Sequence, residues 1–199
     1  MVGMVEDKIN EIKSYAKENN VPIMMDDGID FLTNLIRQRK VKNILEIGTA
    51  IGYSAIMMAL VNDDIKITSI EKDDKRYFEA IKNIKKFNLE DRITLIYNDA
   101  LEIKLKDKYD LIFIDAAKGQ YTKFFEKYKN FLNPNGTIIT DNIKFHGYVG
   151  ESSKLDKGNL KSLVEKIENY IEFLKSNTEF DTKFYDIGDG LSVSTWKHE

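Results

Sequence analysis

The sequence predicts an α/β protein in which one doubly wound, mostly parallel, seven-stranded sheet ends in a C-terminal antiparallel hairpin. Short apolar runs of strand length alternate with longer segments whose apolar residues recur at helical spacing, the order typical of βα units. The last two apolar runs instead flank Gly188-Asp189-Gly190, which indicates a hairpin. At 199 residues the chain has the size of one domain, so we expect residues 1–199 to fold as a single unit.

Two helices are expected before the sheet, and together they make up residues 1–40. Apolar side chains recur at helical spacing over residues 4–19, and a Val-Pro-Ile segment then ends the helix. A second helix is predicted from an aspartate cap at residue 26 or 27 through Arg39. Residues 41–199 then form a Rossmann-like core.

The first strand and the turn after it form the expected ligand-binding element. Residues 44–47 have the composition of a buried parallel strand, and Gly48, Ala50 and Gly52 allow close approach of the backbone to a ligand. A helix that starts near Tyr53 would direct free amide groups at that ligand. A dinucleotide fingerprint beginning at Gly48 needs glycine at position 50 and glycine or alanine at position 53. Because the chain has Ala50 and Tyr53, the sequence disfavours a dehydrogenase.

The remaining elements follow in the same alternation. Strands that end in polar residues are followed by amphipathic helices, except after the third strand, where a lysine-rich surface connection is expected. An Asn-Pro-Asn-Gly turn precedes the fifth strand, and a long loop without clear periodicity follows it. The predicted strands are residues 65–70, 93–97, 109–114, 137–140, 182–187 and 191–196, and the long loop spans residues 143–158.

The composition excludes several classes of protein. The chain has no cysteine, which leaves no disulfide framework and no thiolate metal site, so a cytoplasmic location is expected. No apolar stretch approaches the roughly 18 residues of a membrane span, so no membrane association is predicted. The net charge of −3 argues against a general nucleic-acid coat, although local clusters of lysine and arginine occur.

Polar residues stand where the predicted parallel strands end, the edge at which open α/β sheets bind ligands. Glu71 lies 23 residues after Gly48, about the offset at which an acidic side chain accepts hydrogen bonds from a ribose. Asp99 and Ala100 follow the third strand and would lie near an adenine. Each of these residues is also common in ordinary turns and helix starts.

A metal site is expected where the fourth and fifth strands end. Asp115, Asp141 and Asn142 should converge there, since these strands are expected to be neighbours. Three oxygen ligands suit a hard ion such as Mg²⁺, which keeps water or substrate oxygens in its coordination shell. The alternative is that these three side chains only cap strands and form turns.

Several motifs together resemble the metal-dependent O-methyltransferases of the catechol and caffeoyl-CoA type. The segments VPIM, ILEIGTAIGYSA, IEKD, NDA, DLIFIDAAKGQY and TDNIKFHG occur in family order and spacing from about Val21 to the C-terminus. Within the family, the chain is most similar to the bacterial tRNA 5-hydroxyuridine methyltransferases. The resemblance implies the class I methyltransferase fold and S-adenosylmethionine (SAM) as methyl donor.

The resemblance also implies roles for individual residues. Lys118 falls where the catechol enzymes place their general base, and Asp115 and Asp141 complete the expected catalytic group. The Mg²⁺ ligands would be Asp115, Asp141 and Asn142. The SAM site would include Met24, Glu46, Gly48, Tyr53, Ser54, Glu71, Asp99, Ala100 and Asp115.

One departure from the family affects the expected methyl acceptor. The small-catechol enzymes have a tryptophan immediately before the lysine, and this chain has Ala117, which predicts a more open pocket. We therefore expect transfer to 5-hydroxyuridine at the tRNA wobble position, giving 5-methoxyuridine. Lys144, His146, Lys154 and Lys157 could meet the phosphates of the anticodon loop. A small catechol-like or caffeoyl-type phenol is the alternative acceptor, and a SAM- or RNA-binding module is the non-enzymatic alternative.

A homodimer is expected because the helix at residues 4–19 and the apolar terminal hairpin both need packing partners. Packing within one chain would satisfy both equally well.

Overall fold

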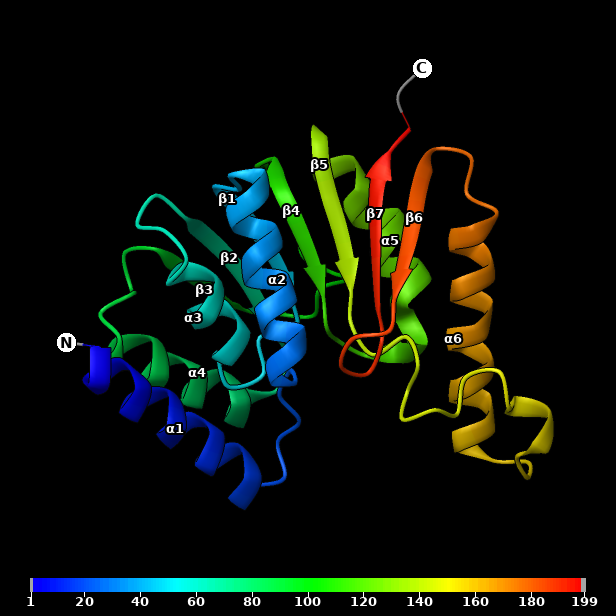
Figure 1. Cartoon of the computed structure of the whole chain (residues 1–199), viewed down its shortest axis with the longest axis horizontal. Coiled ribbons are helices and arrows are strands. Elements are labelled where there is room, and N and C mark those ends of the chain that lie inside the picture. Colours follow the sequence, from blue (N-terminus) through cyan, green and yellow to red (C-terminus); the bar gives the residue numbers. More distant parts are fainter. Residues whose placement is uncertain (1, 198–199) are drawn as a thin grey trace.

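The computed structural model describes residues 2–197 and contains a seven-stranded sheet in the order β3-β2-β1-β4-β5-β7-β6 (Figure 1). Strands β1 to β5 are parallel, and β7 runs antiparallel to both β5 and β6. The predicted fold class is therefore confirmed. The strands are β1 Asn43–Ile47, β2 Lys66–Glu71, β3 Ile93–Tyr97, β4 Tyr109–Ile114, β5 Leu132–Thr140, β6 Phe180–Tyr185 and β7 Leu191–Trp196.

Helices cover both faces of the sheet, because successive residues of the central strands point to opposite sides. Leu111 and Phe113 pack with the first four helices, whereas Ile112 and Ile114 pack with the last two. In Figure 1, α2 lies in front of the strands and α5 behind them. The helices are α1 Val2–Glu18, α2 Asp26–Arg39, α3 Tyr53–Ala59, α4 Asp74–Lys86, α5 Tyr121–Tyr128 and α6 Asn159–Lys175, with short 3₁₀ turns η1 Lys118–Gln120, η2 Lys129–Phe131 and η3 Ser152–Lys154.

Strand β2 is shifted by one residue and β6 by two from the predicted ranges, and two further expected boundaries are wrong for a reason that the structure shows. The N-cap of α2 is Met25, without a side-chain bond, because the Asp27 carboxylate instead accepts from Gly28 N and from Gly188 N of the hairpin. Strand β5 begins at Leu132, and the expected Asn-Pro-Asn-Gly turn is an irregularity inside it. That irregularity is fixed by Asn133, which donates to Asp110 Oδ1 over 2.7 Å.

The connection between β3 and β4 contains no helix within the described residues, and a lysine from α5 supports it. Lys127 Nζ donates to three carbonyl oxygens of the connection, those of Ala100, Leu101 and Ile103, over 2.7–2.8 Å. Burial lowers the pKa of Lys127. One ammonium group therefore satisfies backbone acceptors that a helix would have satisfied internally.

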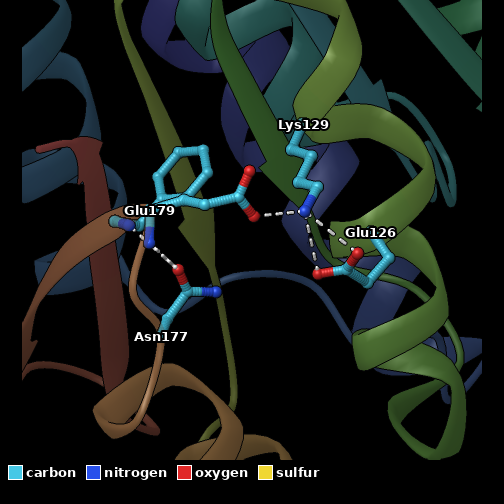
Figure 2. A network of polar contacts seen from close by, with 5 residues as sticks. Glu126, Lys129, Asn177 and Glu179 are labelled. Atoms are coloured by element: carbon cyan, nitrogen blue, oxygen red, sulfur yellow. Dashed lines mark hydrogen bonds and ion pairs between the residues drawn. The ribbon is translucent and has the colours of Figure 1, made fainter.

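A surface ion-pair network joins the end of α5 to the segment that enters β6 (Figure 2). Lys129 lies between Glu126, at 3.1 Å, and Glu179. Asn177 Oδ1 accepts from the backbone amides of Glu179 and Phe180, which fixes the turn before the strand. The network therefore helps to dock the C-terminal hairpin on the helical layer.

Helix α1 and the C-terminal hairpin, from which a dimer was predicted, both pack against the core of the same chain. Ile12 and Ala16 of α1 are buried in the core, as are Leu191 and Val193 of the hairpin. These contacts remove the original reason to expect a dimer, which stays a prediction. Over residues 2–197, no helix combines the length and apolarity that a membrane crossing would need.

Candidate active site

A cavity of about 790 Å³ opens at the carboxyl ends of the parallel strands, the lower end of the sheet in Figure 1. Its walls come from the segment before α2, from the ends of β1, β2, β3, β4 and β5, and from the loop after β5. The structure thus brings together most of the residues chosen from the sequence. Those that line the cavity are Met24, Gly48, Glu71, Asp99, Ala100, Asp115, Lys118, Asp141 and Asn142.

The glycine-containing turn after β1 packs tightly against the backbone that follows β4. Gly48 has a φ of +96°, and a Cβ there would lie 2.1 Å from the carbonyl oxygen of Asp115. Glycine is therefore required where the chain leaving β1 passes the chain leaving β4. Ala50 adopts a φ of +48° and directs its amide at Glu71.

Glu71 lines the cavity, and its carboxylate already accepts hydrogen bonds from the surrounding backbone. Its Oε2 accepts from Ala50 N over 2.7 Å, and its Oε1 accepts from the amides of Lys72 and Asp73 over 2.9 Å. This carboxylate therefore connects the end of β2 to the glycine-containing turn. A bound ribose would share it with those amides.

Asp99 and Ala100 form a turn on the far side of the cavity. Asp99 Oδ1 accepts from Leu101 N over 2.8 Å, and this hydrogen bond, reinforced by the charge of Lys72, lowers the pKa of Asp99. The carbonyl oxygen of Ala100 accepts from Lys127 and from the Tyr128 hydroxyl. These hydrogen bonds fix the conformation of the turn at the cavity edge.

Three residues expected at the cofactor lie behind the turn and do not line the cavity. Glu46 is fully buried and accepts from the hydroxyls of Ser54 and Ser69. Burial raises the pKa of Glu46 to about 8. Tyr53 is buried near Asp26, with 3.5 Å between the hydroxyl and Oδ1. Direct contact of Glu46, Tyr53 and Ser54 with SAM stays a prediction.

Two carboxyl groups end the neighbouring strands β4 and β5. Asp141 is only 3% exposed, and burial together with the negative charge of Asp115 raises its pKa to about 7. Burial likewise raises the pKa of Asp115, against the opposing charge of Lys118. Two acids that oppose each other's ionisation favour a cation between them.

Lys118 and Asn142 complete this end of the cavity. Lys118 Nζ donates to Asn142 Oδ1 over 2.5 Å and lies 5.8 Å from the centre of the Phe145 ring. Asn142 has a left-handed backbone with a φ of +58°, which asparagine tolerates better than most residues. A basic nitrogen, an amide oxygen and two carboxylates therefore face one region.

The donor set fits a hard divalent cation. It offers two carboxylates and one amide oxygen, the ligands that Mg²⁺ accepts while keeping waters or substrate oxygens. Within residues 2–197, no group of three or more His, Cys, Asp or Glu side chains forms a metal cluster. Any metal held here would therefore depend on the asparagine amide as well as on the two acids.

Sequence reasoning missed some of the cavity wall. Met25 and Asp189 both line the cavity, and Asp189 is only 8% exposed. In the sequence Asp189 stands between two glycines, so it was interpreted as a hairpin turn residue. Its position beside Asn142 depends on how the hairpin packs against the loop after β5, which no local pattern reveals.

The cations proposed to meet phosphate are mostly paired within the chain. Lys144 forms an ion pair with Asp186, and Lys154 forms one with Glu151. His146 lines the cavity, and its ring Nδ1 lies 3.7 Å from the Asp189 carboxylate. These contacts weaken the expectation that the loop presents free charge to RNA.

The chain matches the O-methyltransferase family over residues 4–196. It is 28% identical to a caffeoyl-CoA O-methyltransferase of Populus kitakamiensis, across 91% of this chain and 80% of that one. It is 32% identical to a catechol O-methyltransferase of Niastella koreensis, across 76% and 69%. The chain therefore belongs to the O-methyltransferase family.

Solved structures agree with this assignment. A candidate caffeoyl-CoA O-methyltransferase from Staphylococcus aureus is 39% identical, with a TM-score of 0.91 and coverage of 95% of this chain and 92% of that one. An O-methyltransferase from Bacillus cereus in complex with S-adenosylhomocysteine (SAH) is 26% identical, with a TM-score of 0.83 and coverage of 96% and 91%. The protein is a SAM-dependent O-methyltransferase.

Proposed function

We propose that the protein transfers the methyl group of SAM, with the help of Mg²⁺, to one of two adjacent oxygens on a planar ring. The observation that carries the proposal is the meeting of Asp115, Asp141, Asn142 and Lys118 at one end of the cavity. Two adjacent oxygens can share one metal ion, so this donor set suits such an acceptor better than an isolated hydroxyl.

Within this proposal the two ends of the cavity have separate roles. Glu71, Asp99 and Ala100 hold the nucleoside part of SAM beside the glycine-containing turn. Asp115, Asp141 and Asn142 hold Mg²⁺ at the other end. SAM supplies the methyl group and Mg²⁺ supplies Lewis acidity when they are bound.

The residues at the acceptor end have three tasks in this mechanism. Lys118 Nζ, as the neutral amine, takes the proton from the acceptor hydroxyl, so that the oxygen attacks as an anion. Met25 and Phe145 provide apolar walls that exclude water from the ring. Holding both reactants in one cavity supplies the proximity that the transfer needs.

A catechol-like or caffeoyl-type phenol is the acceptor that the named relatives support. The relatives include enzymes named for catechol and for caffeoyl-CoA. The dihydroxylated ring of such a phenol is small, and a cavity of about 790 Å³ has the size of sites that bind small molecules.

5-Hydroxyuridine in a tRNA anticodon loop is the second candidate, and Ala117 favours it. This small residue lines the cavity directly before Lys118, so the wall there leaves room for a base carried by a large substrate. The 5-hydroxyl and 4-oxo groups of this base are adjacent, as the hydroxyls of a catechol are. A single-stranded base can be turned into such a cavity at modest cost.

The two acceptors can be separated with purified protein and isotope-labelled SAM. Catechol, caffeoyl-CoA and an anticodon stem-loop that contains 5-hydroxyuridine are each offered with Mg²⁺, and the products are identified by mass spectrometry. Methylation of the phenols alone selects the first candidate, and methylation of the stem-loop alone selects the second. If none of the three compounds is methylated, the proposed acceptor class is contradicted.

A further inference from the structure

The hairpin turn between β6 and β7 supplies a buried acid that the proposed chemistry does not yet use. Asp189 lines the cavity beside Asn142, yet it comes from the opposite end of the core sequence. Its two flanking glycines have φ values of +55° and +84°. A Cβ on Gly190 would lie 2.6 Å from the Lys144 side chain, so the turn packs tightly against the loop after β5.

Both carboxylate oxygens of Asp189 are directed at that loop. Oδ1 accepts from His146 N over 2.6 Å, and Oδ2 accepts from Asn142 Nδ2 over 3.4 Å. Two backbone bonds, Lys144 N to Asp189 O and Ile143 N to Gly190 O, hold the same two segments together. The Asp189 carboxylate therefore accepts one hydrogen bond from the loop backbone and one from the Asn142 side chain, and its Oδ2 also lies 3.7 Å from the His146 ring Nδ1.

The contact with Asn142 decides which way the amide faces. A carboxylate only accepts hydrogen bonds, so Asn142 must turn its NH₂ group toward Asp189. The amide oxygen then faces the cavity, where it accepts from Lys118 Nζ. Lys118 favours the same orientation by donating to the amide oxygen, and Asp189 favours it from the other side by accepting from the NH₂ group. When a cation takes the oxygen in place of Lys118, Asp189 is the contact that still opposes a reversed amide, which would present its NH₂ group to the cation.

We propose that Asp189 is a positioning residue, which orients the Asn142 amide so that its oxygen serves as a cation ligand. The proposal rests on the proposed metal-dependent function. It adds a residue from the hairpin turn to the acceptor end of the cavity, which explains why a buried acid stands between two glycines.

Asp189→Asn tests this most directly, because the substitution keeps size while placing an NH₂ group opposite the Asn142 amide. Binding of Mn²⁺ to the SAH complex, followed by electron paramagnetic resonance, reports on the site without turnover. We expect the affinity for Mn²⁺ to fall by about 10- to 100-fold, the usual effect of losing a partner that orients a metal ligand. SAH affinity, measured by calorimetry, should stay at the wild-type value.

Glu168→Gln is the matched control. Glu168 anchors a later part of the same loop by accepting from Gly150 N over 2.7 Å and from the Ser152 hydroxyl, and within residues 2–197 it forms no hydrogen bond or ion pair with Asn142. Loosening the loop at this point should leave Mn²⁺ affinity unchanged. A loss as large as that of Asp189→Asn would overturn the proposal, because general loop disorder would then explain both.

Exchanging the two residues provides a rescue. In the double variant Asn142→Asp, Asp189→Asn, the new amide at 189 donates to the new carboxylate at 142, which still has an oxygen for the cation. Mn²⁺ affinity should recover most of its loss, and this also decides the question if the single variant is unstable. Wild-type affinity in Asp189→Asn, or no recovery in the double variant, overturns the role of Asp189 but leaves the proposed metal dependence intact. Absence of Mn²⁺ binding to the wild-type protein overturns the proposed metal dependence as well.

Discussion

Glu46 shows how a single buried acid links the cofactor turn to the core. Its pKa of about 8 means that the folded chain keeps a proton which the unfolded chain, near an ordinary value of 4.5, has already released. Rising pH between these two values therefore favours the unfolded chain, by roughly 1.4 kcal/mol per pH unit at most. The stability associated with Glu46 is complete below about pH 4.5 and decreases toward pH 8.

Glu46→Gln should flatten this dependence, because the amide keeps the shape and stays neutral. Urea denaturation at several pH values between 5 and 8 measures the effect. Glu46→Ala should instead destabilise the fold by about 1 to 3 kcal/mol, since it leaves the hydroxyls of Ser54 and Ser69 without their acceptor. Equal slopes for wild type and Glu46→Gln would show that Glu46 is ionised in the folded protein.

Glu71 is the second residue whose role can be measured. Glu71→Ala should weaken SAM binding by about 1 to 3 kcal/mol, through loss of charge-assisted hydrogen bonds. Calorimetric titration with SAM measures this. Because the side chain also accepts from Ala50 N, Glu71→Gln serves as the control that keeps an acceptor for the turn. Wild-type affinity in both variants would remove Glu71 from the SAM site.

At the scale of elements, the segment between β3 and β4 depends on one side chain from α5. Lys127→Met keeps the aliphatic length but leaves the carbonyls of Ala100, Leu101 and Ile103 without their charged donor. The free energy of unfolding should fall by about 1.5 to 3 kcal/mol, the range for hydrogen bonds to charged groups. Lys123→Met, on an exposed position of the same helix, is the comparison. Equal unfolding free energies for the two variants would contradict this role.

The elements also show what local patterns can and cannot predict. Strands β3 and β4 have the predicted bounds, because strand-length apolar runs end at clear polar residues. Strand β5 begins earlier than predicted, since the Asn-Pro-Asn-Gly segment is held in the sheet by Asp110, which lies far away in sequence. The predicted N-cap of α2 was wrong for a similar reason, because the Asp27 carboxylate accepts a hydrogen bond from Gly188 N of the hairpin.

The candidate site likewise contains residues that local patterns predicted and residues that they missed. Asp115, Asp141 and Asn142 were predicted together because parallel strands end at one edge of a sheet. Asp189 was not, because its place beside Asn142 follows from the docking of the hairpin. Residues whose position follows from sheet order are accessible to sequence reasoning, whereas contacts between distant loops are not.

At the scale of the whole molecule, a homodimer remains a prediction. Light scattering at micromolar concentration should give twice the mass of the 23.1 kDa chain. The apolar residues of α1 and of the hairpin pack within the chain, so an interface would have to use other surface residues. A mass near that of one chain, independent of concentration, would refute the prediction.

The central claim is that Asp115, Asp141 and Asn142 support metal-dependent methyl transfer to an oxygen. The most direct measurement follows transfer from labelled SAM to whichever acceptor the enzyme methylates, with EDTA and with Mg²⁺ restored, for wild type and Asp141→Ala. We predict that EDTA abolishes wild-type turnover, that Mg²⁺ restores it, and that Asp141→Ala stays inactive while still binding SAM. Undiminished turnover in EDTA, together with an active Asp141→Ala variant, would contradict the claim.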